Sequence, residues 1–196
     1  MKERELEELK AQVDTCQRCQ LREGCQRVVF GEGNPEASLM LIGEGPGAEE
    51  DRLGRPFVGR AGQLLDKILE ACGFQRFTHT YIGNIVKCRP PGNRIPTAEE
   101  RQTCRPYLHR QIDIIMPKII VLLGATALQG LIDPQAKITK SRGNWLKWQG
   151  IWVMPTYHPA ALLRNPQLKR PTWEDFKQVV EKYRELVDSN HYSPNC

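Results

Sequence analysis

Four short, mostly apolar runs of residues constrain the fold of this chain most strongly. They are Leu39–Ile42, Tyr81–Val86, Ile119–Leu123 and Ile151–Met154. Each is far too short to span a membrane, and continuous apolarity is typical of strands that are buried on both faces. Segments with helical signals separate the runs. This order predicts an α/β fold, a three-layer α/β/α sandwich in which helices cover both faces of a four-stranded parallel sheet.

The helical signals are apolar residues at helical spacing and residues that favour helix ends. Thr97 and Glu100, for example, match a capping box at the start of a helix. The expected helices span about 3–13, 61–72, 97–116 and 171–187. The 196 residues are expected to form a single domain, 1–196, with a structured loop over about 14–34 and a frayed tail after about residue 188.

Three loops follow the carboxyl ends of predicted strands and hold most of the unusual residues. They span Gly43–Arg60, Asn84–Pro96 and Tyr157–Arg164. In sheets of this kind the ligand crevice lies beyond the carboxyl ends of the strands. The sequence therefore predicts that the functional site lies where these three loops meet.

Charge and hydropathy narrow the class of protein. The N-terminus is charged rather than apolar, and no apolar run approaches the roughly 18 residues of a membrane span, so a cytoplasmic, reducing location without membrane contact is expected. The net charge of +5 is compatible with a phosphate-bearing partner. Charge alone does not identify that partner as nucleic acid.

Seven cysteines are many for a cytoplasmic chain, and an odd number argues against a disulfide framework. Cys16 and Cys19 form a C-x-x-C pair, and Cys88 and Cys104 follow far downstream. Two neighbouring and two distant thiolates can close a site for zinc or for an iron–sulfur cluster, and spacing does not separate the two. The alternative is that these cysteines are small buried apolar residues. The other three are interpreted in turn as a substitute ligand, a core residue and a free thiol: Cys25, Cys72 and Cys196.

Two of the loops carry candidate chemistry. In the first, Gly43 and Gly45 allow the backbone to approach a ligand closely, and Phe57 offers either a stacking surface for a flat base or additional core. In the last, His158 follows a strand and is held by a proline, so it either donates a hydrogen bond into the crevice or caps a turn. The adjacent Leu162 and Leu163 are interpreted either as wedges for a base stack or as the start of a buried helix.

Four segments, taken in order, resemble the family 4 (iron–sulfur, thermostable-type) uracil-DNA glycosylases. They are Gly43–Gly47 (GEGPG), Gly54–Gly62 (GRPFVGRAG), Asn84–Pro91 (NIVKCRPP) and His158–Arg164 (HPAALLR). The resemblance runs from about Cys16 to Phe176. It implies an enzyme of DNA repair that flips uracil out of single- or double-stranded DNA and hydrolyses its N-glycosidic bond. Free uracil and an abasic site are the implied products, and a monomer is expected.

The resemblance also implies roles for individual residues. Phe57 stacks on the flipped uracil, Asn84 reads its Watson–Crick edge and His158 donates to its O2 atom. Glu44 belongs to the motif that lies beside the attacking water molecule. Glu50 lines the pocket where the methyl group of thymine would lie. The implied ligands of a structural 4Fe-4S cluster are Cys16, Cys19, Cys88 and Cys104.

Elementary chemistry agrees with these roles. Reaching a base requires extrusion of the nucleotide, and Leu162, with Leu163 and Arg164, would fill the vacated space. An asparagine amide distinguishes uracil from cytosine because the two bases reverse donors and acceptors. In the best-studied branch of the superfamily an aspartate positions the attacking water, but Gly45 stands here, so Glu44 is the candidate for that task.

Two other functions remain open from the sequence. The first is a non-catalytic iron–sulfur protein that binds nucleic acid without turnover. A related branch traps the sugar with a histidine in a basic insertion, but residues 89–100 contain no histidine. The second is a phosphate-ester enzyme that uses the glycine-rich loop. It would need a carboxylate-rich metal site or a Walker-type Gly-Lys-Ser/Thr motif, and neither occurs here.

Overall fold

A computed structural model describes all of residues 1–196 and contains one mixed sheet of six strands in the order β1-β3-β2-β4-β6-β5. The four central strands are parallel, as predicted: β3 (Thr80–Asn84), β2 (Leu39–Gly43), β4 (Ile119–Leu123) and β6 (Ile151–Thr156). Two short antiparallel strands, β1 (Glu32–Gly33) and β5 (Leu146–Trp148), extend the edges. The sequence missed these edges because two or three residues carry no recognisable periodicity.

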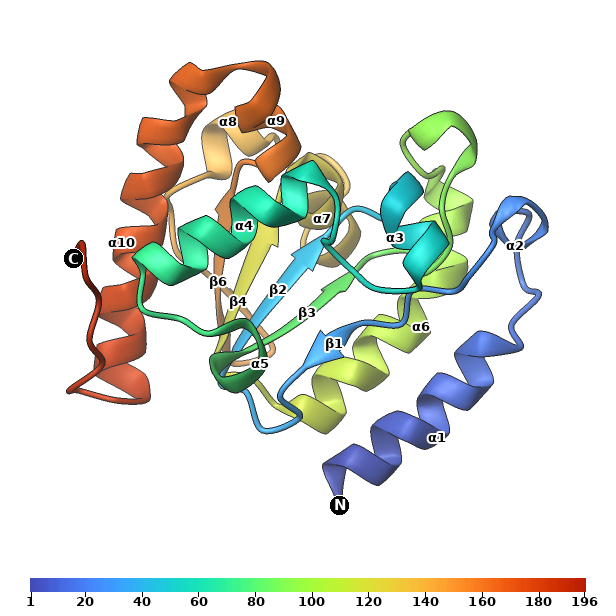
Figure 1. Ribbon diagram of the computed structural model, residues 1–196, viewed down its shortest axis with the longest axis horizontal. Helices are drawn as coiled ribbons and strands as arrows, with labels where there is room; N and C mark the ends of the chain where they lie inside the picture. The colour runs from blue at the N-terminus through green and yellow to red at the C-terminus, as the bar shows by residue number, and fades with distance from the viewer.

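Helices cover both faces of the sheet (Figure 1). The longer ones are α1 (Lys2–Asp14), α4 (Arg60–Ala71), α6 (Ala98–Ile115), α7 (Ala125–Leu131) and α10 (Lys169–Leu186). Shorter helical segments are α2 (Leu21–Gly24), α3 (Ala48–Leu53), α5 (Arg76–His79), α8 (Ile138–Ser141), α9 (Pro159–Arg164), and the 3-10 turns η1 (Pro91–Asn93) and η2 (Pro166–Leu168). The α/β/α prediction is therefore confirmed. No helix combines the length and the apolar character needed to cross a membrane.

The alternation of side chains along each strand divides the core in two. Met40 and Ile42 of β2 pack with residues of α1, α6 and α7, whereas Leu39 and Leu41 pack with residues of α4 and α10. Side chains on a strand point alternately to the two faces, so a strand buried on both sides must be apolar throughout. This explains the unbroken apolar runs. The two cores hold the parallel strands, and hence their carboxyl ends, in fixed register.

The start of α6 shows how local sequence determines local structure. The predicted capping box is present: the Glu100 amide donates to the Thr97 hydroxyl, at 3.2 Å, and the Thr97 amide donates to the Glu100 carboxylate, at 2.8 Å.

The tail after Asp188, which the sequence predicted to fray, instead packs on the end of α4. The His191 ring bonds the Cys72 carbonyl, at 2.9 Å, and stacks on Phe74 with ring centroids 4.6 Å apart.

A buried ion pair fixes the end of β6, the strand that leads into the His158 loop. Asp175 on α10 is fully buried and accepts hydrogen bonds from the Arg142 guanidinium and from the Thr156 hydroxyl, the latter at 2.6 Å. A buried carboxylate is tolerated only when it is paired and hydrogen-bonded. Asp175 therefore anchors the last residue of β6 to α10.

We expect Asp175→Ala to destabilise the protein by about 3–5 kcal/mol, because it leaves the partly buried Arg142 without its counter-ion. Urea unfolding followed by circular dichroism measures the change. Glu174→Ala is the matched control, since Glu174 is the neighbouring residue of the same helix and forms an exposed pair with Lys177. That control should cost about 0–1 kcal/mol. Equal losses for the two variants would contradict the assignment.

Candidate functional site

The carboxyl ends of the central strands bring three loops together. Gly43 of β2 is paired in register with Asn84 of β3, and the Gly124 amide, just after β4, donates to the Thr156 carbonyl at the end of β6. A Cβ atom on Gly124 would lie 3.0 Å from the Cβ of His158. Residues from four separate strand ends thus meet at one edge of the sheet, as the sequence predicted.

Asn84 carries the most informative side chain at this edge. It is 1% exposed, and its Oδ1 atom is the only buried side-chain oxygen or nitrogen that lacks a hydrogen-bond partner. A Cβ on Gly43 would lie 2.6 Å from this oxygen and 2.5 Å from the Cζ atom of Phe57. Leaving such an acceptor unpaired costs about 1–3 kcal/mol. Its presence indicates a ligand that brings an N–H or O–H donor to this position.

Phe57 is held beside Asn84 in a strained conformation. Its φ angle is +50°, which is unusual for a residue other than glycine, and its side chain is 5% exposed. Arg76 donates to the Phe57 carbonyl at 2.9 Å, and a Cβ on Gly62 would lie only 2.0 Å from the Phe57 backbone. Several contacts therefore fix the ring, whose centroid lies 5.5 Å from that of His158 at an interplanar angle of 28°.

Glu50 supports the same loop. Its Oε1 atom accepts hydrogen bonds from the amides of Val58, at 2.9 Å, and Gly59, at 2.8 Å. The family resemblance implied that Glu50 lines the pocket where the methyl group of thymine would lie. The contacts describe a carboxylate that fixes the backbone directly after Phe57, so Glu50 affects the pocket at least through the position of that ring.

His158 is oriented by the helix that it precedes. Its Nδ1 atom accepts a hydrogen bond from the Ala160 amide, at 3.0 Å, and so caps α9. The pKa of His158 is lowered to about 4, first because burial disfavours the charged ring and second because Arg164 is positively charged; Glu50 opposes the shift. The ring is therefore neutral near pH 7. With Nδ1 acting as the acceptor, the proton resides on Nε2, which is left as a donor.

Glu44 has a partner that the sequence did not reveal. The Thr126 hydroxyl on α7 donates to the Glu44 carboxylate at 2.5 Å, and Thr126 is 82 residues away in the chain. This contact fixes the direction of the carboxylate at the strand edge. No motif contains Thr126, so only the packing of α7 beside β2 could have identified it.

The leucine pair on α9 differs from the expectation. Leu162, the predicted wedge, is buried with 1% of its surface exposed, whereas Leu163 is 38% exposed. The helix α9 packs on α4, and this packing covers Leu162 but leaves Leu163 accessible. Leu162 therefore cannot reach a base stack in this structure, and Leu163, followed by the exposed Arg164, has the accessible side chain.

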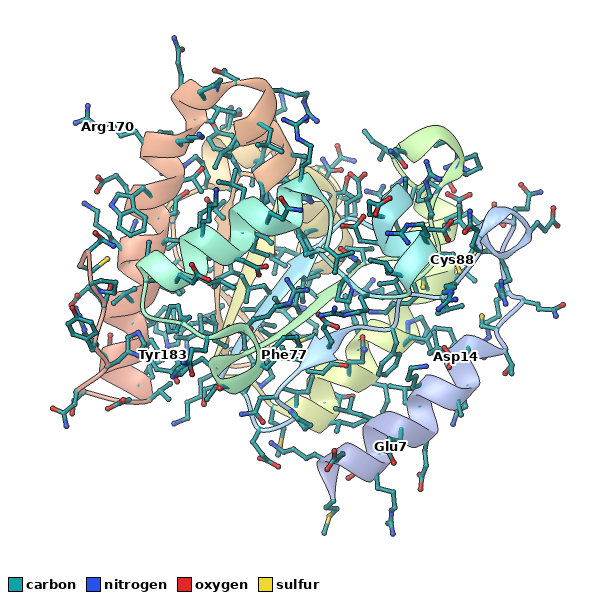
Figure 2. The ribbon with its side chains drawn as sticks, viewed as in Figure 1. Glu7, Asp14, Phe77, Cys88, Arg170 and Tyr183 are labelled. Carbon is teal, nitrogen blue, oxygen red and sulfur yellow. The ribbon has the colours of Figure 1, made fainter.

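The four candidate ligand cysteines come together although they lie far apart in sequence. All four line a single small cavity, together with residues such as Lys87 and Tyr107: Cys16, Cys19, Cys88 and Cys104. Figure 2 labels Cys88 on the right of the molecule, near α3 and α2. No three His, Cys, Asp or Glu side chains are arranged to hold a single metal ion.

The remaining cysteines lie in three different settings. Cys72 is fully buried in the core between the sheet and α4, and burial raises the pKa of its thiol to about 12. Cys196 is exposed at the chain end. Cys25 is buried and faces Cys88, one of the four cavity cysteines, so the structure keeps it near the predicted ligands without placing it in the lining of the cavity.

Comparison with known proteins gives a consistent result. A family model described as the uracil DNA glycosylase superfamily matches residues 30–179. A type-4 uracil-DNA glycosylase of Thermotoga maritima is 48% identical over 89% of this chain and 92% of its own length. One of Sulfurisphaera tokodaii is 47% identical over 90% of this chain and 84% of its own length. A type-5 uracil-DNA glycosylase of Thermus thermophilus is 30% identical over 82% and 81%.

We expect His158 to titrate near pH 4 rather than at its ordinary value of 6.5. The unfolded chain takes up this proton at the ordinary value, so the histidine should reduce the stability of the fold progressively as the pH falls from about 6.5 to about 4. Ring nitrogen shifts in NMR measure the titration and report the proton on Nε2. Arg164→Ala should raise the pKa. A midpoint near 6.5 in the wild type would contradict the burial of a neutral ring.

Proposed function

The chain belongs to the uracil DNA glycosylase superfamily, and from its type-4 relatives we infer that it is a DNA-repair enzyme that removes uracil from DNA. The single observation that supports this function at a particular site is the unpaired Oδ1 atom of Asn84. Uracil presents an N–H donor at N3 beside an acceptor at O4, which matches the two ends of a primary amide. Cytosine presents an acceptor at N3, so it would leave Oδ1 without a donor.

We propose that Phe57 forms the floor on which the extruded base stacks. A base cannot be cut while it lies within a duplex, so the nucleotide must rotate out into the pocket at a cost of a few kcal/mol. Stacking on an aromatic ring offsets this by about 1–3 kcal/mol. The glycine at position 43 is needed here because any Cβ would collide with both Phe57 and Asn84.

His158 then stabilises the leaving group. As the C1′–N1 bond breaks, its electron pair passes to the uracil ring and negative charge develops on O2. The Nε2–H group of a neutral imidazole donates a hydrogen bond to that oxygen. Because the ring is fixed by the Ala160 amide before the reaction, no reorganisation is needed when the charge appears.

Glu44 acts on the water side. We propose that its carboxylate accepts a proton from the water molecule whose oxygen bonds to C1′ as uracil leaves, and that the departing uracil anion is protonated afterwards. Thr126 keeps the carboxylate oriented through its hydrogen bond. In this chain Gly45 occupies the position of the aspartate that positions the water in the best-studied branch. The Glu44 carboxylate takes over that task.

Leu163 and Arg164 are proposed to contact the DNA. Leu163 has the accessible apolar side chain on α9, directly after the segment that carries His158, and it can fill the gap that a flipped nucleotide leaves. Arg164 adds a positive charge for phosphate. This assignment replaces the buried Leu162.

We further propose that a 4Fe-4S cluster is held by Cys16, Cys19, Cys88 and Cys104. Support comes from the single small cavity that these four cysteines line together. A cluster offers each thiolate a separate iron atom, so its ligands surround a volume, whereas zinc requires four donors around one ion. The cluster supplies a structural cross-link between the N-terminal segment, the loop after β3 and α6.

Uracil excision is tested with a uracil-containing oligonucleotide, followed by alkali cleavage and by chromatography of the released base. We expect His158→Ala to lower the rate by about 10²–10³-fold, because it removes a donor from the developing anion. Asn84→Ala should also lose activity. His109→Ala, a histidine on α6 outside the pocket, is the control and should remain active. Binding of uracil-DNA by the wild type without release of free uracil would instead identify a non-catalytic binding protein.

The cluster is tested by anaerobic purification and iron analysis. We expect a brown protein that contains about four iron atoms per chain. Cys104→Ser should lose iron and unfold more readily, because one ligand of the cross-link is removed. Cys72→Ala, at a buried cysteine outside the cavity, should keep its iron. A colourless protein that holds one zinc ion would contradict the cluster.

A further inference from the structure

Lys87 is a buried charged residue to which the reaction described above assigns no task. It is 1% exposed, and none of the ion pairs in the protein includes it. Removing an ammonium group from water is costly unless other groups compensate for its charge. A lysine in such a position therefore requires a reason.

The hydrogen bonds of Lys87 lead directly to the base-reading residue. Its Nζ atom donates to the backbone carbonyl of Asn84, at 3.0 Å, and to the side-chain oxygen of Gln111, at 2.7 Å. Gln111 on α6 is itself fully buried and donates to the Phe30 carbonyl, at 2.9 Å. The ammonium group thus ties the end of β3 to the C-terminal part of α6.

The same lysine borders the cysteine cavity. Lys87 lines this cavity and directly precedes Cys88 in the chain. The Cys104 thiol lies near the backbone amide and the ammonium group of Lys87. Thiolates that hold an iron–sulfur cluster carry net negative charge. A cluster would therefore provide the compensation that no carboxylate in the structure provides.

We propose that Lys87 is a positioning residue that couples the cysteine cavity to uracil recognition. Its ammonium group holds the Asn84 carbonyl, and so sets the place of the Asn84 amide, while the cluster thiolates balance its charge. The inference deepens the proposed function and rests on the role of Asn84 in reading uracil. It gives the cluster a second effect, on base recognition, in addition to cross-linking the fold.

A double-mutant cycle with Lys87→Met and Asn84→Ala tests the link. Methionine keeps the length of the side chain but removes its charge and its donors. We expect Lys87→Met to weaken the binding of free uracil, measured by calorimetry, by about tenfold in the wild-type background and hardly at all beside Asn84→Ala. Equal losses in both backgrounds, or no loss, would overturn the proposal. Lys118→Met is the matched control, since that exposed lysine also donates to a backbone carbonyl, that of Leu186, elsewhere.

Two further measurements keep the test decisive. Gln111→Met removes the other acceptor of Lys87, so it should show the same coupling with Asn84→Ala even if Lys87→Met folds poorly; additive losses here would also overturn the link. Reduction of the cluster, followed by its spectrum, should need a more negative potential in Lys87→Met, because a neighbouring positive charge is lost. An unchanged potential would refute the charge balance. Wild-type protein that releases no uracil would refute the proposed function itself, before any variant is compared.

Discussion

The site depends on the in-register ends of parallel strands. Because β2 and β3 run in the same direction, Gly43 and Asn84 end side by side, and β4 and β6 deliver Gly124 and His158 to the same edge. No single loop could hold an amide, an aromatic ring and an imidazole so closely. The two apolar cores, one on each side of the sheet, keep this alignment rigid. The positions of the site side chains are therefore fixed by the packing of the sheet.

The pocket combines features that cost stability with contacts that hold them in place. An unpaired side-chain amide oxygen at Asn84 and a positive φ angle at Phe57 are both unfavourable in the free protein. Arg76, Glu50 and the Gly62 position fix the Phe57 segment so that these features persist. Under the proposed function, an arriving uracil would relieve the first cost by supplying a donor to the Asn84 side chain, which makes recognition selective as well as favourable.

The sequence predicted what local pattern determines and missed what long-range packing determines. The four central strands follow from apolar runs, and the Thr97 capping box follows from two residues. Thr126 carries no such signal, because its partner Glu44 lies in a distant segment. Adjacent leucines on a short helix look alike in sequence. Only the direction in which α9 packs on α4 decides that Leu162 is buried and Leu163 accessible.

The C-terminal tail after Asp188 packs on α4 and so links two distant parts of the molecule. His191 closes over one end of α4, where it bonds Cys72, and the other end of the same helix supports the Phe57 backbone through Gly62. The helix α4 therefore joins His191 to the ring of Phe57, the proposed floor of the pocket. A change that loosens the packing of His191 can therefore shift α4 and, through Gly62, the backbone that holds the Phe57 ring.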